Sequence, residues 1–72
     1  MNNLKSATNL FIQAQQEARL SATQMAAGEL NGNKFVLVLG EQGWQADVTL
    51  RNGFQTVVCA TQIARAVRLI AS

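Results

Sequence analysis

The chain has 72 residues, 49% of them apolar and only 14% charged, and six Lys/Arg against four Asp/Glu give a net charge of +2. This length allows one small domain with a marginal core. The charged fraction is well below the ~25% of typical globular proteins, which excludes a disordered chain and suggests that another subunit covers part of the surface. The sequence contains neither a run of ~18 apolar residues nor the apolar region of a signal peptide, so we expect a soluble cytoplasmic protein without a membrane span.

Residues 3–27 contain neither glycine nor proline and follow a helical pattern. Leu4, Phe11, Ala18 and Met25 recur every seven residues, which predicts one long helix with a single apolar stripe. Such a helix is roughly 37 Å long, whereas a six-residue strand is only about 20 Å long. We therefore expect part of the helix to extend beyond the sheet and to pack on a second subunit.

Two turns in the middle of the chain predict an antiparallel meander. Gly40–Gly43 is typical of a four-residue hairpin loop, and Asn52-Gly53 indicates a two-residue type I′ turn. The register that they imply pairs Phe35 with Val48, and Val48 with Val57. It puts one apolar set, which includes Val57 and Cys59, on a single inner face of the sheet. The predicted strands cover residues 34–39, 44–50 and 54–59.

A final helix is predicted over residues 61–71, where the apolar residues again recur at helical spacing. The expected fold class is therefore α+β, with the order α-β-β-β-α. If residues 54–59 are helical instead, the order becomes α-β-β-α.

The residue types argue against catalysis. Histidine and tyrosine are absent, and the four carboxylates are scattered over different predicted elements, whereas acid-base chemistry needs groups that converge on a pocket. The single cysteine, Cys59, falls on the predicted inner face of the sheet without a base to activate it. We predict a protein that is not an enzyme and that binds neither a metal nor a cofactor.

The other face of the predicted sheet holds more apolar residues than a solvent-facing surface needs. Val36 and Val38 lie there on a strand that would be an edge, and open edges invite pairing with another chain. We expect this strand to pair with its counterpart in a homodimer, or this face to dock on a protein partner. The residues predicted at such an interface are Phe11, Met25, Val36, Val38, Trp44, Thr49, Phe54 and Val58.

These features favour a small binding protein, oligomeric and acting as a regulator or inhibitor, of the kind that phages and other mobile elements encode. A nucleic-acid-binding regulator is an alternative, since the predicted element order is shared with double-stranded-RNA-binding domains. The lysine cluster that those domains carry at the start of the last helix is missing. The cations that could contact nucleic acid or an acidic partner are Lys34, Arg51, Arg65 and Arg68. A structural assembly component is a second alternative.

Overall fold

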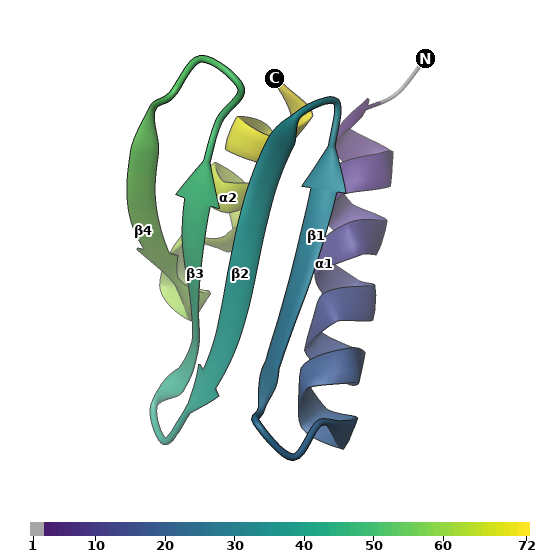
Figure 1. Ribbon diagram of the computed structural model, residues 1–72, viewed down its shortest axis with the longest axis vertical. Coiled ribbons are helices and arrows are strands. Elements are labelled where there is room, and N and C mark those ends of the chain that lie inside the picture. The colour runs from purple at the N-terminus through teal and green to yellow at the C-terminus, as the bar shows by residue number, and fades with distance from the viewer. Residues whose placement is uncertain (1–2) are drawn as a thin grey trace.

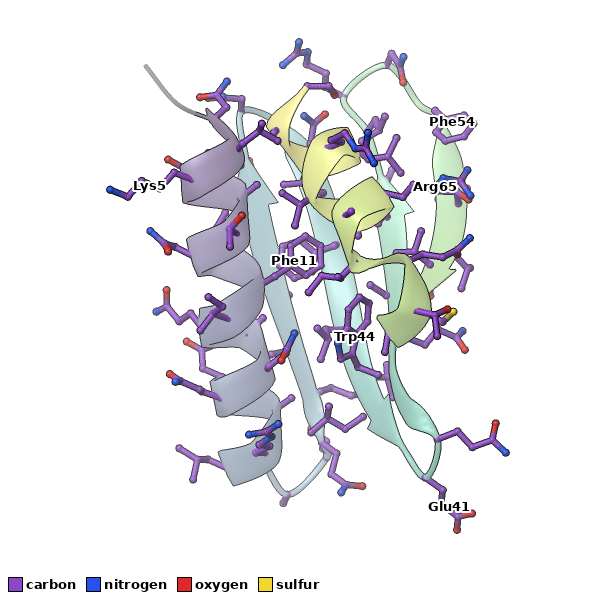
Figure 2. The ribbon with its side chains drawn as sticks, turned by 180° about the vertical axis from the view of Figure 1, so that it is seen from behind. Lys5, Phe11, Glu41, Trp44, Phe54 and Arg65 are labelled. Carbon is purple, nitrogen blue, oxygen red and sulfur yellow. The ribbon has the colours of Figure 1, made fainter. Side chains whose placement is uncertain are left out.

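The computed structural model describes residues 3–72, which form an α+β fold of two layers (Figure 1). The four strands pair antiparallel in chain order, β1-β2-β3-β4. Both helices pack on one face of this sheet, as the views from its two sides show (Figure 1 and Figure 2). The elements are α1 Asn3–Leu20, β1 Met25–Leu30, β2 Asn33–Gly40, β3 Gly43–Thr49, β4 Gln55–Cys59, the 3₁₀ turn η1 Ala60–Gln62 and α2 Ile63–Ala71.

The predicted fold class is confirmed, but the N-terminal helix is shorter than predicted, because the chain turns at residues 21–24. The Ser21 hydroxyl accepts a hydrogen bond from the Thr23 N–H at 3.2 Å, and the Ser21 carbonyl accepts one from the Gln24 N–H at 3.1 Å. Such local bonds compete with helix continuation, and Gln24 takes a φ of +55°. α1 therefore has 18 residues. At about 27 Å it matches the length of the strands, so the predicted overhang does not exist.

The segment that was predicted as the end of the helix forms a fourth strand, β1. Its sequence, MAAGEL, lacks β-branched residues and is rich in helix formers. The turn that follows decides its structure: Asn31 and Gly32 have φ values of +54° and +85°. A type I′ turn requires positive φ at both central residues, and it returns the chain antiparallel to itself. β2 is consequently an inner strand, paired with β1 and β3, and the prediction that it is an edge is wrong.

The register between β2 and β3 is as predicted. Leu39 pairs with Trp44, and Phe35 pairs with Val48. The ladder continues one pair beyond the prediction, to Gly40 and Gly43, so the loop contains two residues instead of four.

The register between β3 and β4 differs from the prediction by one residue. The Leu50 carbonyl accepts a hydrogen bond from the Gly53 N–H at 2.9 Å, the Leu50 N–H donates to the Phe54 carbonyl at 2.8 Å, and Gly53 has a φ of +94°. These features define a three-residue loop with a bulge at glycine, where the Asn-Gly pair had suggested a two-residue turn. Val48 therefore pairs with Thr56. β4 does form, so the α-β-β-α alternative is excluded.

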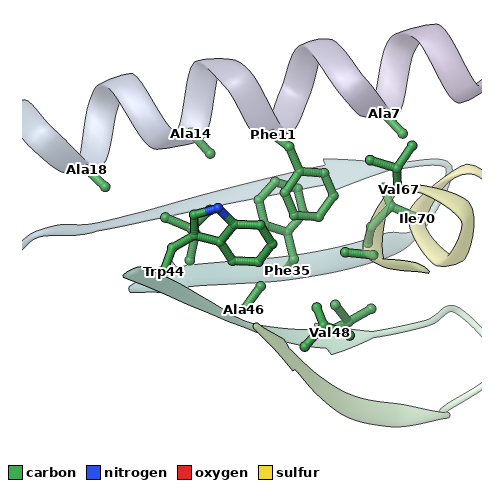
Figure 3. Close-up of a cluster of buried hydrophobic side chains, with 13 residues drawn as sticks. Ala7, Phe11, Ala14, Ala18, Phe35, Trp44, Ala46, Val48, Val67 and Ile70 are labelled. Carbon is green, nitrogen blue, oxygen red and sulfur yellow. The ribbon is translucent and has the colours of Figure 1, made fainter. Parts of the chain in front are cut away.

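The core lies between the sheet and the two helices (Figure 3). The ring of Phe11 on α1 stacks on Phe35 of β2, with centroids 4.2 Å apart and planes 13° apart, and Trp44 lies 6.0 Å from Phe11. Gly28 on β1 leaves room for this stack, since a Cβ there would come within 2.5 Å of the Phe35 ring. Small side chains let α1 approach the sheet closely; they are Ala7, Ala14 and Ala18.

Asn33, the first residue of β2, joins three parts of the fold. Its side chain is buried, and its Nδ2 donates to the main-chain oxygens of Ile70 at 3.0 Å and Ser72 at 2.9 Å. Its Oδ1 accepts a hydrogen bond from the Arg51 N–H at 3.0 Å. The amide thus ties the end of α2 and the β3–β4 loop to the sheet. It satisfies carbonyls that a helix end leaves without intrahelical partners.

Candidate interaction surface

The face of the sheet opposite the helices is uncovered within residues 3–72 (Figure 1). We call it the open face. Cross-strand pairing arranges its side chains in three rows that run across the four strands. The rows are Met25, Val38, Gln45 and Cys59; Ala27, Val36, Asp47 and Val57; and Glu29, Lys34, Thr49 and Gln55.

The apolar part of the open face lies mainly on the β1–β2 hairpin. Met25 is 45% exposed, and Val36 and Val38 are each 39% exposed, although β2 buries its alternate residues Phe35 and Leu37 almost completely. Ala27 fills the position beside Val36. The outward residues of β3 are polar, and they separate the hairpin from Val57 on β4, which is 51% exposed.

Charge is distributed unevenly between the two sides of the molecule. The open face has one cation, Lys34, and two carboxylates, Glu29 and Asp47, a net side-chain charge of −1. Glu29 and Lys34 are direct cross-strand partners. The two helices together have four cations and one carboxylate, a net charge of +3.

The structure brings together part of the predicted interface. Met25, Val36, Val38 and Thr49 all lie on the open face. Phe54 is exposed in the loop before β4 and is not part of the open face.

Three predicted interface residues, Phe11, Trp44 and Val58, lie in the core instead. Phe11 is on the buried stripe of α1, which covers the sheet without overhang. Trp44 packs near Phe11, as the labelled side chains of Figure 3 show. Val58 faces inward because of the one-residue shift between β3 and β4, which turns every side chain of β4 to the opposite face.

The four predicted cations do not form one patch. Lys34 is on the open face, whereas Arg65 and Arg68 are on α2, which packs against the opposite face of the sheet. Arg51 is in the β3–β4 loop, where its guanidinium donates to the Asn31 carbonyl at 3.3 Å. A surface that follows a nucleic-acid backbone needs its cations on one side.

Sequence reasoning missed several residues of the open face. Ala27 and Glu29 were assigned to the helix or to its end, and Val57 and Cys59 were expected on the inner face. The available signal for a hairpin was the Asn31-Gly32 pair, which is typical of a two-residue turn between antiparallel strands.

Cys59 is exposed at the end of β4, not buried as predicted. Its sulfur lies 3.0 Å from the Thr61 hydroxyl, and hydrogen bonds from the Thr61 side chain and then from the Thr61 backbone lower the pKa of the thiol below its usual value. No cluster of three or more His, Cys, Asp or Glu residues that could hold a metal occurs within the described part of the chain.

A shallow apolar depression of about 510 Å³ lies on the other side of the molecule, between α1 and α2. Leu4 and Thr8 form its wall on α1, while Ile63 and Val67 contribute from α2. It is a second surface where apolar side chains remain accessible to a partner.

Comparison with known proteins adds no relative: no family model, curated protein or solved structure matches this chain. From residue 3 onward, neither helix has the length and apolar character needed to cross a membrane.

Proposed function

We propose that this protein is a non-catalytic interaction module that binds a protein partner through the open face and acts as a regulator or inhibitor. The observation that carries the proposal is the exposure of Met25, Val36 and Val38 side by side on the helix-free face of the sheet. In an antiparallel sheet with one solvated face, apolar side chains that face the core normally alternate along each strand with polar side chains that face solvent. Clustered apolar residues on such a face are typical of a contact surface.

The arrangement of the polar residues supports binding over chemistry. The carboxylates Glu17, Glu29, Glu41 and Asp47 stand on α1, β1, the β2–β3 turn and β3, so they do not converge as acid-base catalysis requires. The open face has one shallow depression, of about 370 Å³ over β3 and β4, and is otherwise an extended surface of regular strands, which suits a protein partner better than a small substrate.

Affinity capture with a matched pair of variants tests this function. The wild-type protein, Val36→Lys and Gln16→Lys are immobilised separately and exposed to an extract of the source cells. Val36 and Gln16 are both exposed, on the open face and on α1 respectively, so both variants should fold and carry the same added charge. We expect a protein that is retained by the wild type and by Gln16→Lys but lost with Val36→Lys.

Two results would count against the proposal. Equal retention by all three proteins would show that the captured protein does not bind through the open face. Retention of nucleic acid alone, with affinity that falls steeply as salt increases, would favour the nucleic-acid-binding alternative.

A further inference from the structure

We infer that a second copy of this chain binds the open face, by packing of one β1–β2 hairpin on the other around a two-fold axis. This inference rests on the proposed function, because it names the partner of the same surface. It starts from the register of the hairpin, whose outward pairs are Met25 with Val38, Ala27 with Val36, and Glu29 with Lys34.

The hairpin surface is complementary to itself. Consider a two-fold axis that runs parallel to the strands and passes midway between β1 and β2. Each outward residue of β1 has a cross-strand partner on β2. The axis places the β1 residue opposite this same β2 residue in the second copy. Met25 then faces Val38 of the second copy, and Glu29 faces Lys34 of the second copy, with both contacts repeated by symmetry. An isologous interface requires this kind of self-complementarity.

The positions of the charged residues favour this arrangement over an alternative dimer in which the second copy covers the whole open face. An axis between β2 and β3 would bury more surface, but it would place Asp47 of each copy above Val36 of the other. A carboxylate buried without a cation is strongly unfavourable. In the hairpin arrangement, Asp47 stays outside the overlap, and every charge within the overlap faces its opposite. The register therefore favours the hairpin.

The predicted dimer is weak. Two strands about 4.8 Å apart and six residues long at ~3.3 Å per residue give a footprint only ~20 Å long and about 10 Å wide. Standard interfaces bury about 800 Å² per partner, and smaller ones occur in transient complexes. We expect dissociation in the micromolar range or above. The Glu29–Lys34 contacts lie at one end of the overlap, where charges mainly fix orientation and partner choice.

A charge-exchange experiment tests this dimer directly. Lys34→Glu gives a hairpin with two carboxylates, and Glu29→Lys gives one with two ammonium groups. Sedimentation equilibrium should show a monomer–dimer equilibrium for the wild type and at least a tenfold weaker association for each variant alone. An equimolar mixture of the two variants should associate again, because each carboxylate of one copy then faces an ammonium group of the other. Native mass spectrometry should identify the product as the heterodimer.

The mixture is the decisive measurement, because in both variants positions 29 and 34 of the same subunit carry like charges, whether or not the other variant is present. Recovery of association can therefore come only from contacts between subunits. Gln55→Glu, a charge change in the same row but on β4, is the matched control and should leave the dimer intact. Thermal unfolding of each variant establishes that it is folded.

Each other outcome overturns the inference in a recognisable way. A wild type that stays monomeric up to millimolar concentration excludes a second copy as the occupant. A dimer that neither single variant weakens uses another surface, such as the edge of β4 or the depression between the helices. If the mixture fails to associate, Glu29 of one copy does not face Lys34 of the other, and the arrangement is refuted. Capture of a different protein that is lost with Val36→Lys, by a wild type that stays monomeric, would support the proposed function and overturn only this inference.

Discussion

Replacement of Asn33 by alanine should destabilise the protein more than any other single truncation of a polar side chain. The amide is only 1% exposed and makes three hydrogen bonds of 2.9 to 3.0 Å to main-chain atoms. Alanine would leave the Ile70 carbonyl, the Ser72 oxygen and the Arg51 N–H without these partners. The first of these bonds is buried, and the other two are partly buried.

The size of the effect follows from these environments. A buried group left unsatisfied costs about 1–3 kcal/mol, while each partly buried bond, which water can replace, contributes roughly 0.5–1.5 kcal/mol. These contributions predict a loss of about 3 kcal/mol. The total stability of a 72-residue domain is of the order of 4–11 kcal/mol, so the variant should lose a large part of it. The midpoint of thermal unfolding should fall by roughly 12–24 °C.

Urea unfolding followed by circular dichroism measures this loss. Lys34→Ala, at the adjacent exposed position, is the control and should change the free energy of unfolding by less than ~0.5 kcal/mol. Asn33→Asp keeps the acceptor for the Arg51 N–H but replaces the amide donor with an oxygen that faces two other oxygens, so it should destabilise at least as much as alanine. A loss below 1 kcal/mol in Asn33→Ala would refute the view that this amide holds the end of α2 on the sheet.

Three further predictions concern local geometry. Gly28→Ala should destabilise by ~1–3 kcal/mol in urea unfolding, because the new methyl group would overlap the stacked phenyl ring that covers this glycine; an unchanged midpoint would contradict that packing. Val58→Lys should destabilise severely, by roughly 3 kcal/mol or more, because the side chain is buried, whereas Val57→Lys should have little effect, because that side chain is exposed and lies beside the carboxylate of its cross-strand partner Asp47; a larger loss in Val57→Lys than in Val58→Lys would contradict this register between β3 and β4. Alkylation of Cys59 by iodoacetamide should show a pH midpoint below that of a free thiol, and Thr61→Val should raise that midpoint by removing the hydrogen bond that lowers the pKa; identical midpoints would exclude this contact in solution.

The parts of the fold that the sequence predicted well are those where periodicity and turn chemistry agree. Between β2 and β3, alternation from Trp44 onward and glycines at both ends of the turn allow only one register, and the structure has it. α2 was also predicted within two residues, because its apolar stripe is regular.

The errors occurred where two signals conflicted. Met25–Leu30 consists mainly of helix-forming residues but precedes an Asn-Gly pair that favours a hairpin, and the seven-residue recurrence that joined Met25 to Phe11 was coincidental. Pairing with β2 through the Asn31–Gly32 turn outweighs helix propensity, and this long-range stabilisation cannot be read from the segment itself.

The candidate site was only partly predictable for a related reason. An Asn-Gly pair is compatible with loops of two or three residues, and the difference of one residue exchanges Val57 and Val58 between the two faces. The residues of β2, whose register did not depend on that loop, were correctly placed together on the outward face as Lys34, Val36 and Val38.

The strand order of this sheet has a consequence for how the chain folds. Every strand pairs with its neighbour in sequence, through connections of only two to five residues, so contacts within the sheet are local and entail little loop-closure entropy. The contacts between the two terminal helices, by contrast, span nearly the whole chain, as in the hydrogen bond from the Asn3 side chain to the Ala71 carbonyl. Among the contacts between elements, docking of α2 on α1 therefore carries the largest loop-closure entropy.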